Sequence, residues 1–217
     1  YSTEQLIQLI ADVKTSIPPY CRVNRVIRDI PSGHIVAGSR RSSLRQDALA
    51  ELARRGQRCQ CIRCREIRGS SVESSSLSMQ DQVYLAGGAQ EHFISFVTPE
   101  DKIAGFVRLS LPGKHSPATG LPDLKDAAII REVHVYGQSL AVGQDADGAA
   151  QHSGLGTRLL QEAEIITIQS GYSRLAVISA VGTRHYYLDR GFKRGEKYLF
   201  KDLSRPIGFL DEDLKET

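Results

Sequence analysis

The sequence of 217 residues has no tryptophan, one methionine and four cysteines, and it lacks any long apolar run. Crossing a bilayer takes roughly 18 consecutive apolar residues, so we predict no contact with a membrane. Three of the four cysteines lie within six residues, which suits disulfides poorly and favours a reducing, cytoplasmic setting. The chain starts at Tyr1 without a basic and then apolar leader, and we expect it to be part of a longer protein.

A glycine loop, Gln-His-Ser-Gly-Leu-Gly-Thr-Arg, occupies residues 151–158, and two absent motifs limit the kinds of ligand that it could bind. The loop has neither the Gly-Lys-Ser/Thr of a P-loop nor the third glycine and later acidic residue of a dinucleotide fold. Apolar residues with helical spacing follow it, so the loop opens directly into a helix. The first amides of a helix lack intrahelical acceptors, which predicts a phosphate or pyrophosphate site here. A glycine pair that only caps the helix is the simpler alternative.

The flanks of this loop predict the order strand, glycine loop, helix, strand, helix. Residues 127–137 form an apolar run that turns to alternation, and residues 174–180 form a second such strand. The Gln-x-x-Gly-x-Gly loop in this order resembles the coenzyme A site of the GCN-five-related N-acetyltransferases. Three stretches resemble one subfamily, the catalytic subunits of the Elongator complex, which are radical-SAM tRNA acetyltransferases. These stretches are Arg-Glu-Val-His-Val-Tyr-Gly, Ala-Val-Ile-Ser-Ala-Val-Gly-Thr-Arg-His-Tyr-Tyr and a basic cysteine cluster.

The resemblance implies an α/β acetyltransferase fold, with a mixed central sheet flanked by helices, over residues 70–217. Before it, residues 1–57 would be the last units of a radical-SAM barrel, and residues 58–69 a zinc-binding knuckle and linker. Within these regions, residue patterns predict helices at 3–17 and 44–55, a Ser-rich linker at 70–79, and strands at 20–31, 82–86, 91–98, 102–111 and 197–203.

The positive charge is concentrated in one block. Between Arg22 and Arg68 there are twelve arginines, no lysine and four acidic residues, so the block carries +8 and the rest of the chain −5. Guanidinium groups suit bidentate phosphate contacts, so we predict that this block binds RNA; a solvated basic face is the alternative. The resemblance implies the anticodon stem-loop of tRNA as partner, together with other Elongator subunits or a second copy of the chain.

Cys59, Cys61 and Cys64 form a Cys-x-Cys-x-x-Cys knuckle. Three close thiols can converge on one soft cation, and zinc prefers four ligands in a tetrahedron. We therefore expect a structural Zn²⁺, with the fourth ligand open between Cys21, a histidine such as His34 and a water; three free thiols are the alternative. The Cys-x-x-x-Cys-x-x-Cys motif of radical-SAM proteins does not occur, so a 4Fe-4S cluster and S-adenosylmethionine would need sequence outside this chain.

The resemblance also implies how acetyl-CoA would bind. The strands at 127–137 and 174–180 would splay apart, and pantetheine would lie between them as an extra strand. The backbone N–H near Val135 would polarise the thioester oxygen, and Tyr187 would protonate the departing thiolate. The residues implied to contact the coenzyme are Glu132, Val133, His134, Val135, Gly154, Leu155, Gly156, Thr157 and Tyr187.

Two further candidates for catalysis lie on the first of these strands. Glu132 and His134 are two residues apart and share a face, so either could orient or activate a water or an acceptor. A buried structural role is the alternative for His134. Tyr186 is expected to pack in the core or to face RNA, because adjacent helical residues point about 100° apart.

Three functions follow for the whole chain. The resemblance implies a tRNA-dependent enzyme that opens acetyl-CoA when tRNA is bound and that modifies carbon 5 of the wobble uridine, where a radical-SAM domain attaches the carboxymethyl precursor. The second hypothesis is a protein lysine acetyltransferase. The third is a zinc-stabilised tRNA-binding module without catalytic activity.

Overall fold

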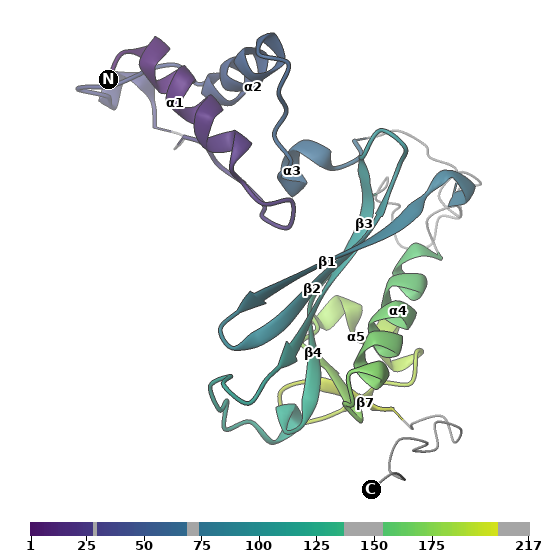
Figure 1. Ribbon diagram of the computed structural model, residues 1–217. Coiled ribbons are helices and arrows are strands. Elements are labelled where there is room, and N and C mark those ends of the chain that lie inside the picture. The colour runs from purple at the N-terminus through teal and green to yellow at the C-terminus, as the bar shows by residue number, and fades with distance from the viewer. Residues whose placement is uncertain (28–29, 69–73, 137–153, 204–217) are drawn as a thin grey trace, which may run out of the picture. The chain divides into compact units, whose positions relative to one another are not determined.

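The computed structural model describes residues 1–27, 30–68, 74–136 and 154–203, and the chain divides into two compact units (Figure 1). Unit 1 comprises residues 1–68 and 101–103, and unit 2 comprises the remainder. Residues 151–153 of the predicted glycine loop lie outside the described residues. Within the described ranges, no helix is long and apolar enough to cross a bilayer.

Unit 1 contains α1 (Thr3–Thr15), the turn η1 (Ser32–His34), α2 (Leu44–Arg54) and α3 (Ile62–Arg65). Ser2 and Gln5 form a reciprocal capping box that starts α1. The helix ends two residues earlier than predicted, because a residue that precedes proline, here Ile17, is disfavoured in the helical conformation.

The core of unit 1 is small, and cysteines form part of it. Ala11 of α1 and Leu52 of α2 pack in one buried cluster with Cys59 and Cys61. Both cysteines are at most 5% exposed, so the knuckle lies inside the core that the two helices cover. Any change at these thiols therefore acts on the packing of unit 1.

The predicted strand at 20–31 is wrong, because no described residue in that range forms a strand. Its backbone groups have other partners. The carbonyl of Cys21 accepts a hydrogen bond of 2.9 Å from the N–H of Ile62. The carbonyl of Val23 accepts one of 2.6 Å from the guanidinium of Arg45. The segment therefore binds the knuckle and α2, and no strand in the described part of the chain pairs with it.

Unit 2 is organised around a seven-stranded sheet in the order β1-β2-β3-β4-β5-β7-β6. β4 pairs in parallel with β5 and antiparallel with β3, so the sheet is mixed, as predicted. Two residues of the predicted linker, Ser78 and Met79, belong to the first strand. The strands are β1 (Ser78–Ala86), β2 (Ala89–Val97), β3 (Ile103–Pro112), β4 (Ala127–Val135), β5 (Arg174–Val177), β6 (Lys193–Arg194) and β7 (Leu199–Asp202).

The long helix of unit 2, α4 (Leu155–Gln169), runs alongside the sheet (Figure 1). It packs on β2, β4 and β5 through an apolar stripe that includes Leu155, Leu159 and Ala163, all at most 1% exposed. The predicted helix after β5 is also present, as α5 (Arg184–Leu188). Short turns complete the unit, namely η2 (Ser74–Ser76), η3 (Pro122–Leu124) and η5 (Val181–Thr183).

Candidate functional site

The candidate site begins where β4 and β5 separate. The two strands pair from Ala127 opposite Arg174 to Ile130 opposite Val177. β5 ends there, whereas β4 continues for five residues to Val135. Backbone N–H and C=O groups of a strand point alternately to its two sides, so this extension offers hydrogen-bonding groups on the side where β5 has ended. An extended ligand can pair with that edge as a further strand. The pairing of β4 with β5 therefore ends before the stretch of β4 where the coenzyme is predicted to bind.

A β-bulge marks the start of this extension. Arg108 of β3 lies opposite Glu132, but the next residue, Leu109, lies opposite Ile130. Arg131 is therefore the extra residue of the bulge. A bulge bends a strand and changes the direction of the side chains and backbone groups that follow it. This bulge therefore redirects β4 just after its pairing with β5 ends. The sequence analysis missed the bulge, because no glycine or turn signal stands there.

The carboxylate of Glu132 is held by a neighbouring cation. The Nε of Arg108 donates to Glu132 Oε2 at 3.0 Å. The same guanidinium lies over the rings of Phe93 and Phe106, at 5.2 and 5.7 Å from their centroids. The side chain of Glu132 is still 40% exposed. This arrangement fixes the orientation of a carboxylate that solvent or a substrate can reach.

The ring of His134 packs between aromatic neighbours. Its centroid lies 5.8 Å from that of Phe106, with the planes within 19°, and 4.4 Å from that of Tyr136. The side chain is half-buried. The packing gives the imidazole one orientation on the same face as Glu132, and its catalytic role stays a prediction.

The start of α4 presents the groups expected at a diphosphate site. Gly154 is the N-cap, and among the described residues no side chain caps the helix. The amides of the first turn, which include those of Leu155, Gly156 and Thr157, therefore have no intrahelical acceptor. Two nitrogens of Arg190 donate to the hydroxyl of Thr157 at 2.9 and 3.2 Å. Backbone amides and a guanidinium at one helix end form an electropositive site for an anion.

Tyr186 connects the start of α4 with the end of β4. A Cβ built on Gly156 would lie 2.5 Å from the hydroxyl oxygen of Tyr186 and 3.7 Å from Cγ2 of Val135. The guanidinium of Arg190 lies 3.7 Å from the centroid of the tyrosine ring. The absence of a side chain at Gly156 thus lets three segments of the predicted coenzyme path meet. The sequence analysis gave Tyr186 no place in the site, because helical spacing alone does not show which of two adjacent tyrosines faces α4.

Tyr187 lies beside it in a more buried position. It is 7% exposed, and its ring packs edge-on against Tyr186 and Phe192, with centroids at 5.3 and 5.5 Å. Burial, followed by the neighbouring Tyr186, raises the pKa of the Tyr187 phenol above its ordinary value. The hydroxyl therefore keeps its proton at neutral pH and can donate it.

Comparison with known proteins agrees with this geometry. The model of the acetyltransferase (GNAT) family matches residues 59–192. The chain belongs to this family. It is 39% identical over 209 residues to a tRNA uridine(34) acetyltransferase of Dehalococcoides mccartyi. The aligned region covers 94% of this chain and 45% of the relative. It is 37% identical over 210 residues to Elongator complex protein 3 of Danio rerio, over 94% of this chain and 38% of the relative.

A solved structure shows the same similarity in three dimensions. The chain matches the archaeal Methanocaldococcus infernus Elp3 with an N-terminal deletion (1–46), with a TM-score of 0.79 and 32% identity. The match covers 94% of this chain and 49% of that chain. The resemblance to the Elongator subfamily and the predicted acetyltransferase fold are thereby confirmed, and acetyl-CoA is the acyl donor that this fold uses. The chain spans less than half the length of these relatives.

The contact at Gly156 gives a first testable prediction. Gly156→Ala should weaken coenzyme A binding about 10-fold, since the new methyl group displaces the Tyr186 hydroxyl from the path between β4 and α4. Gly182→Ala is the matched control, because nothing lies within 4 Å of a Cβ at that position and Gly182 is not among the residues implied to contact the coenzyme. Isothermal titration calorimetry with coenzyme A measures both affinities, and equal affinities would contradict the proposed path.

The three cysteines of the knuckle form a second candidate site. Their sulfur atoms all lie within 4.8 Å of one another, and neither Cys21 nor His34 joins this group. Hydrogen bonds from the thiols of Cys59 and Cys64, and then from backbone N–H groups, lower the pKa of the Cys61 thiol. Close sulfur atoms, one of them favoured as thiolate, are the donor set that zinc prefers, so the residues fit the predicted ion.

Most described arginines of the basic block make ion pairs. Glu66 contacts Arg22, Arg63 and Arg68, with N···O distances of 3.1 to 3.4 Å. The carboxylate of Glu66 is only 8% exposed, but the guanidinium groups of Arg63 and Arg68 face solvent and can contact a phosphate while they stay paired. The side chain of Arg68, for example, remains 67% exposed.

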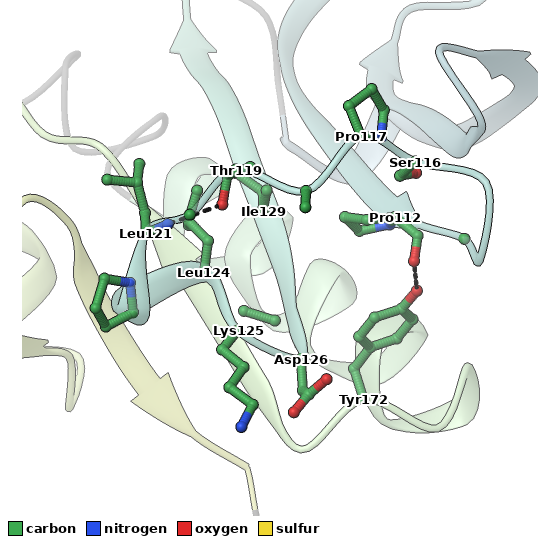
Figure 2. Close-up of a pocket in the computed structure, with 15 residues that line it drawn as sticks. Pro112, Ser116, Pro117, Thr119, Leu121, Leu124, Lys125, Asp126, Ile129 and Tyr172 are labelled. Carbon is green, nitrogen blue, oxygen red and sulfur yellow. Dashed lines mark hydrogen bonds between the residues drawn. The ribbon is translucent and has the colours of Figure 1, made fainter.

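A separate hollow of about 610 Å³ lies under the loop between β3 and β4 (Figure 2). Ala127 and Ile129 of β4 line it, and the hydroxyl of Tyr172 donates a hydrogen bond to the carbonyl of Pro112 at its edge. These β4 residues belong to the half of the strand that pairs with β5, before the splay that follows Ile130. The hollow is therefore distinct from the predicted path of pantetheine.

Proposed function

We propose that this chain is the acetyl-CoA-binding part of an enzyme that modifies carbon 5 of the wobble uridine of tRNA. The similarity to tRNA uridine(34) acetyltransferase and Elongator complex protein 3 over 94% of the chain supports the substrate class. The observation that carries the proposal is the open edge of β4, which leads past Gly156 to the first amides of α4 and to the tyrosines of α5. In the proposed enzyme the carboxymethyl precursor is attached by a radical-SAM domain that this chain does not supply.

In this proposal, pantetheine pairs with β4 from Glu132 to Val135, and the diphosphate binds the amides of Leu155, Gly156 and Thr157. The N–H near Val135 stabilises the negative charge that develops on the thioester oxygen. A water, oriented by Glu132, attacks the carbonyl carbon and passes a proton to that carboxylate. The carbon–sulfur bond breaks, and the leaving thiolate takes the proton of Tyr187.

Unit 1 would supply the tRNA contact and its own metal centre. Exposed guanidinium groups such as those of Arg54, Arg58 and Arg68 would bind phosphates of the anticodon stem-loop. The knuckle of Cys59, Cys61 and Cys64 would hold a Zn²⁺ that stabilises the small core of the unit. Partner subunits, a second copy of the chain and a cytoplasmic location stay predictions.

The test is an assay of thiol release from acetyl-CoA with no acceptor, with tRNA and with lysine-containing peptides. The proposal predicts release that rises with tRNA and does not respond to peptides. Release that responds to peptides alone would favour the lysine acetyltransferase hypothesis. Absence of coenzyme A binding in calorimetry, with tRNA binding retained, would favour the non-enzymatic module.

A further inference from the structure

A buried lysine lies against the cysteine knuckle. Lys14, in the last turn of α1, is only 1% exposed. Its Nζ lies 3.7 Å from the sulfur of Cys59 and 3.8 Å from the sulfur of Cys64. We infer that Lys14 is the fourth ligand of the metal ion held by Cys59, Cys61 and Cys64. This inference rests on the zinc site of the proposed function.

The distances fit two ligands of one tetrahedral ion. With Zn–S and Zn–N bonds of about 2.3 and 2.05 Å, a nitrogen and a sulfur on the same zinc lie about 3.6 Å apart. Both observed separations from Lys14 to sulfur come within a few tenths of an ångström of that value. The Lys14 nitrogen therefore lies about as far from the sulfur atoms of Cys59 and Cys64 as a fourth zinc ligand would lie.

The other candidates for the fourth position do not reach the cluster. Cys21 and His34 are outside the group of ligand atoms that lie within 4.8 Å of one another. Lys14 also has no carboxylate partner among the ion pairs of the described residues. The hydrogen-bond partners of this buried nitrogen are the weakly accepting sulfur atoms of Cys59 and Cys64, so coordination to a metal ion would satisfy it better.

Coordination by Lys14 would explain how a small unit holds its helices. Ala11, one turn earlier on α1, already packs in the cluster with Cys59 and Cys61. A metal bond from Lys14 would tie α1 to a knuckle 45 residues further along the chain. On binding, the protons that the thiols still carry and one ammonium proton leave to solvent, and the ion gains three thiolates and one amine.

The affinity for zinc tests this inference with two variants and a control. Lys14→Leu and Lys14→Arg should each lower zinc affinity more than about 10-fold in a chelator competition, because neither side chain can coordinate the ion. Lys102→Leu is the matched control: its Nζ donates to the backbone carbonyl of Cys64 at 3.3 Å, so affinity should change less than about 2-fold.

A spectroscopic measurement covers the case in which the Lys14 variants fold poorly. In the unaltered protein loaded with ¹¹³Cd and labelled with ¹⁵N-lysine, we expect a scalar coupling between the metal and one lysine nitrogen, and the Lys102→Leu protein should keep it. A metal-loaded protein without this coupling would overturn the assignment of Lys14 and leave the zinc site standing. Purified protein that binds neither zinc nor cadmium would overturn the zinc site itself, and the inference with it.

Discussion

Tyr187→Phe should lower tRNA-stimulated thiol release from acetyl-CoA at least about 100-fold, because the variant has no proton to give to the departing thiolate. The affinity for coenzyme A should stay within about 3-fold, since a phenyl ring preserves the edge-on packing against Phe192. Stopped assays of free thiol and calorimetry with coenzyme A measure the two quantities on the same preparation.

Tyr186→Phe is the matched control for this experiment. Its hydroxyl lies over Gly156 at the start of α4, so we expect its loss to weaken coenzyme binding more than it slows release from saturated enzyme. Undiminished release by the Tyr187 variant would remove that residue from the mechanism. A large loss of release in the Tyr186 variant alone would transfer the role of acid to Tyr186.

Cys61→Ser should have the second large effect. Cys61 is fully buried and belongs both to the sulfur cluster and to the core of unit 1. We expect zinc affinity to fall more than about 100-fold, because this change removes a ligand and not only an outer partner of the ion. The binding energy of a structural zinc is also folding energy, so unit 1 should lose stability and tRNA affinity together.

Cys21→Ser is the control for this experiment, because it removes a thiol of unit 1 that is not a predicted zinc ligand in the cluster. Cys21 is half-buried and lies outside the sulfur cluster, so its variant should keep zinc and tRNA binding. In both variants the affinity for coenzyme A should be unchanged, since the predicted coenzyme residues all belong to unit 2. Elemental mass spectrometry measures the zinc content of both variants. A Cys61 variant that holds as much zinc as the unaltered protein would contradict the metal site.

The parts of the fold that could be predicted are those whose own residues carry a strong local pattern. The apolar stripe of α4, the two strands beside it and the serine-capped α1 needed only periodicity and capping chemistry. The triplet of Cys59, Cys61 and Cys64 was equally readable, because short spacing alone forces the three sulfur atoms together.

The remaining features depend on contacts between distant segments. The bulge at Arg131 arises from pairing with β3 and has no local signature. The carboxylate of Asp123 accepts N–H groups from Glu196, Lys197 and Tyr198, more than seventy positions away. Lys14 looks like an ordinary last-turn lysine in the sequence, and only the packing of α1 brings it to the cysteines.

The same limit explains the wrong prediction of a strand at 20–31. The segment at 20–31 alternates as a strand does, but alternation shows only that two faces differ. In unit 1, Arg45 and the N–H of Ile62 take the backbone carbonyls that a neighbouring strand would need. A strand requires a partner, and the sequence of one segment cannot show whether the partner exists.

A crystal structure with a non-hydrolysable acetyl-CoA analogue tests the central claim most directly. The account predicts pantetheine paired with β4 beyond Ile130, the diphosphate on the amides of Leu155 to Thr157, and the sulfur position beside the tyrosines of α5. An analogue whose diphosphate lies away from the start of α4, or whose sulfur position lies far from Tyr186 and Tyr187, would contradict it.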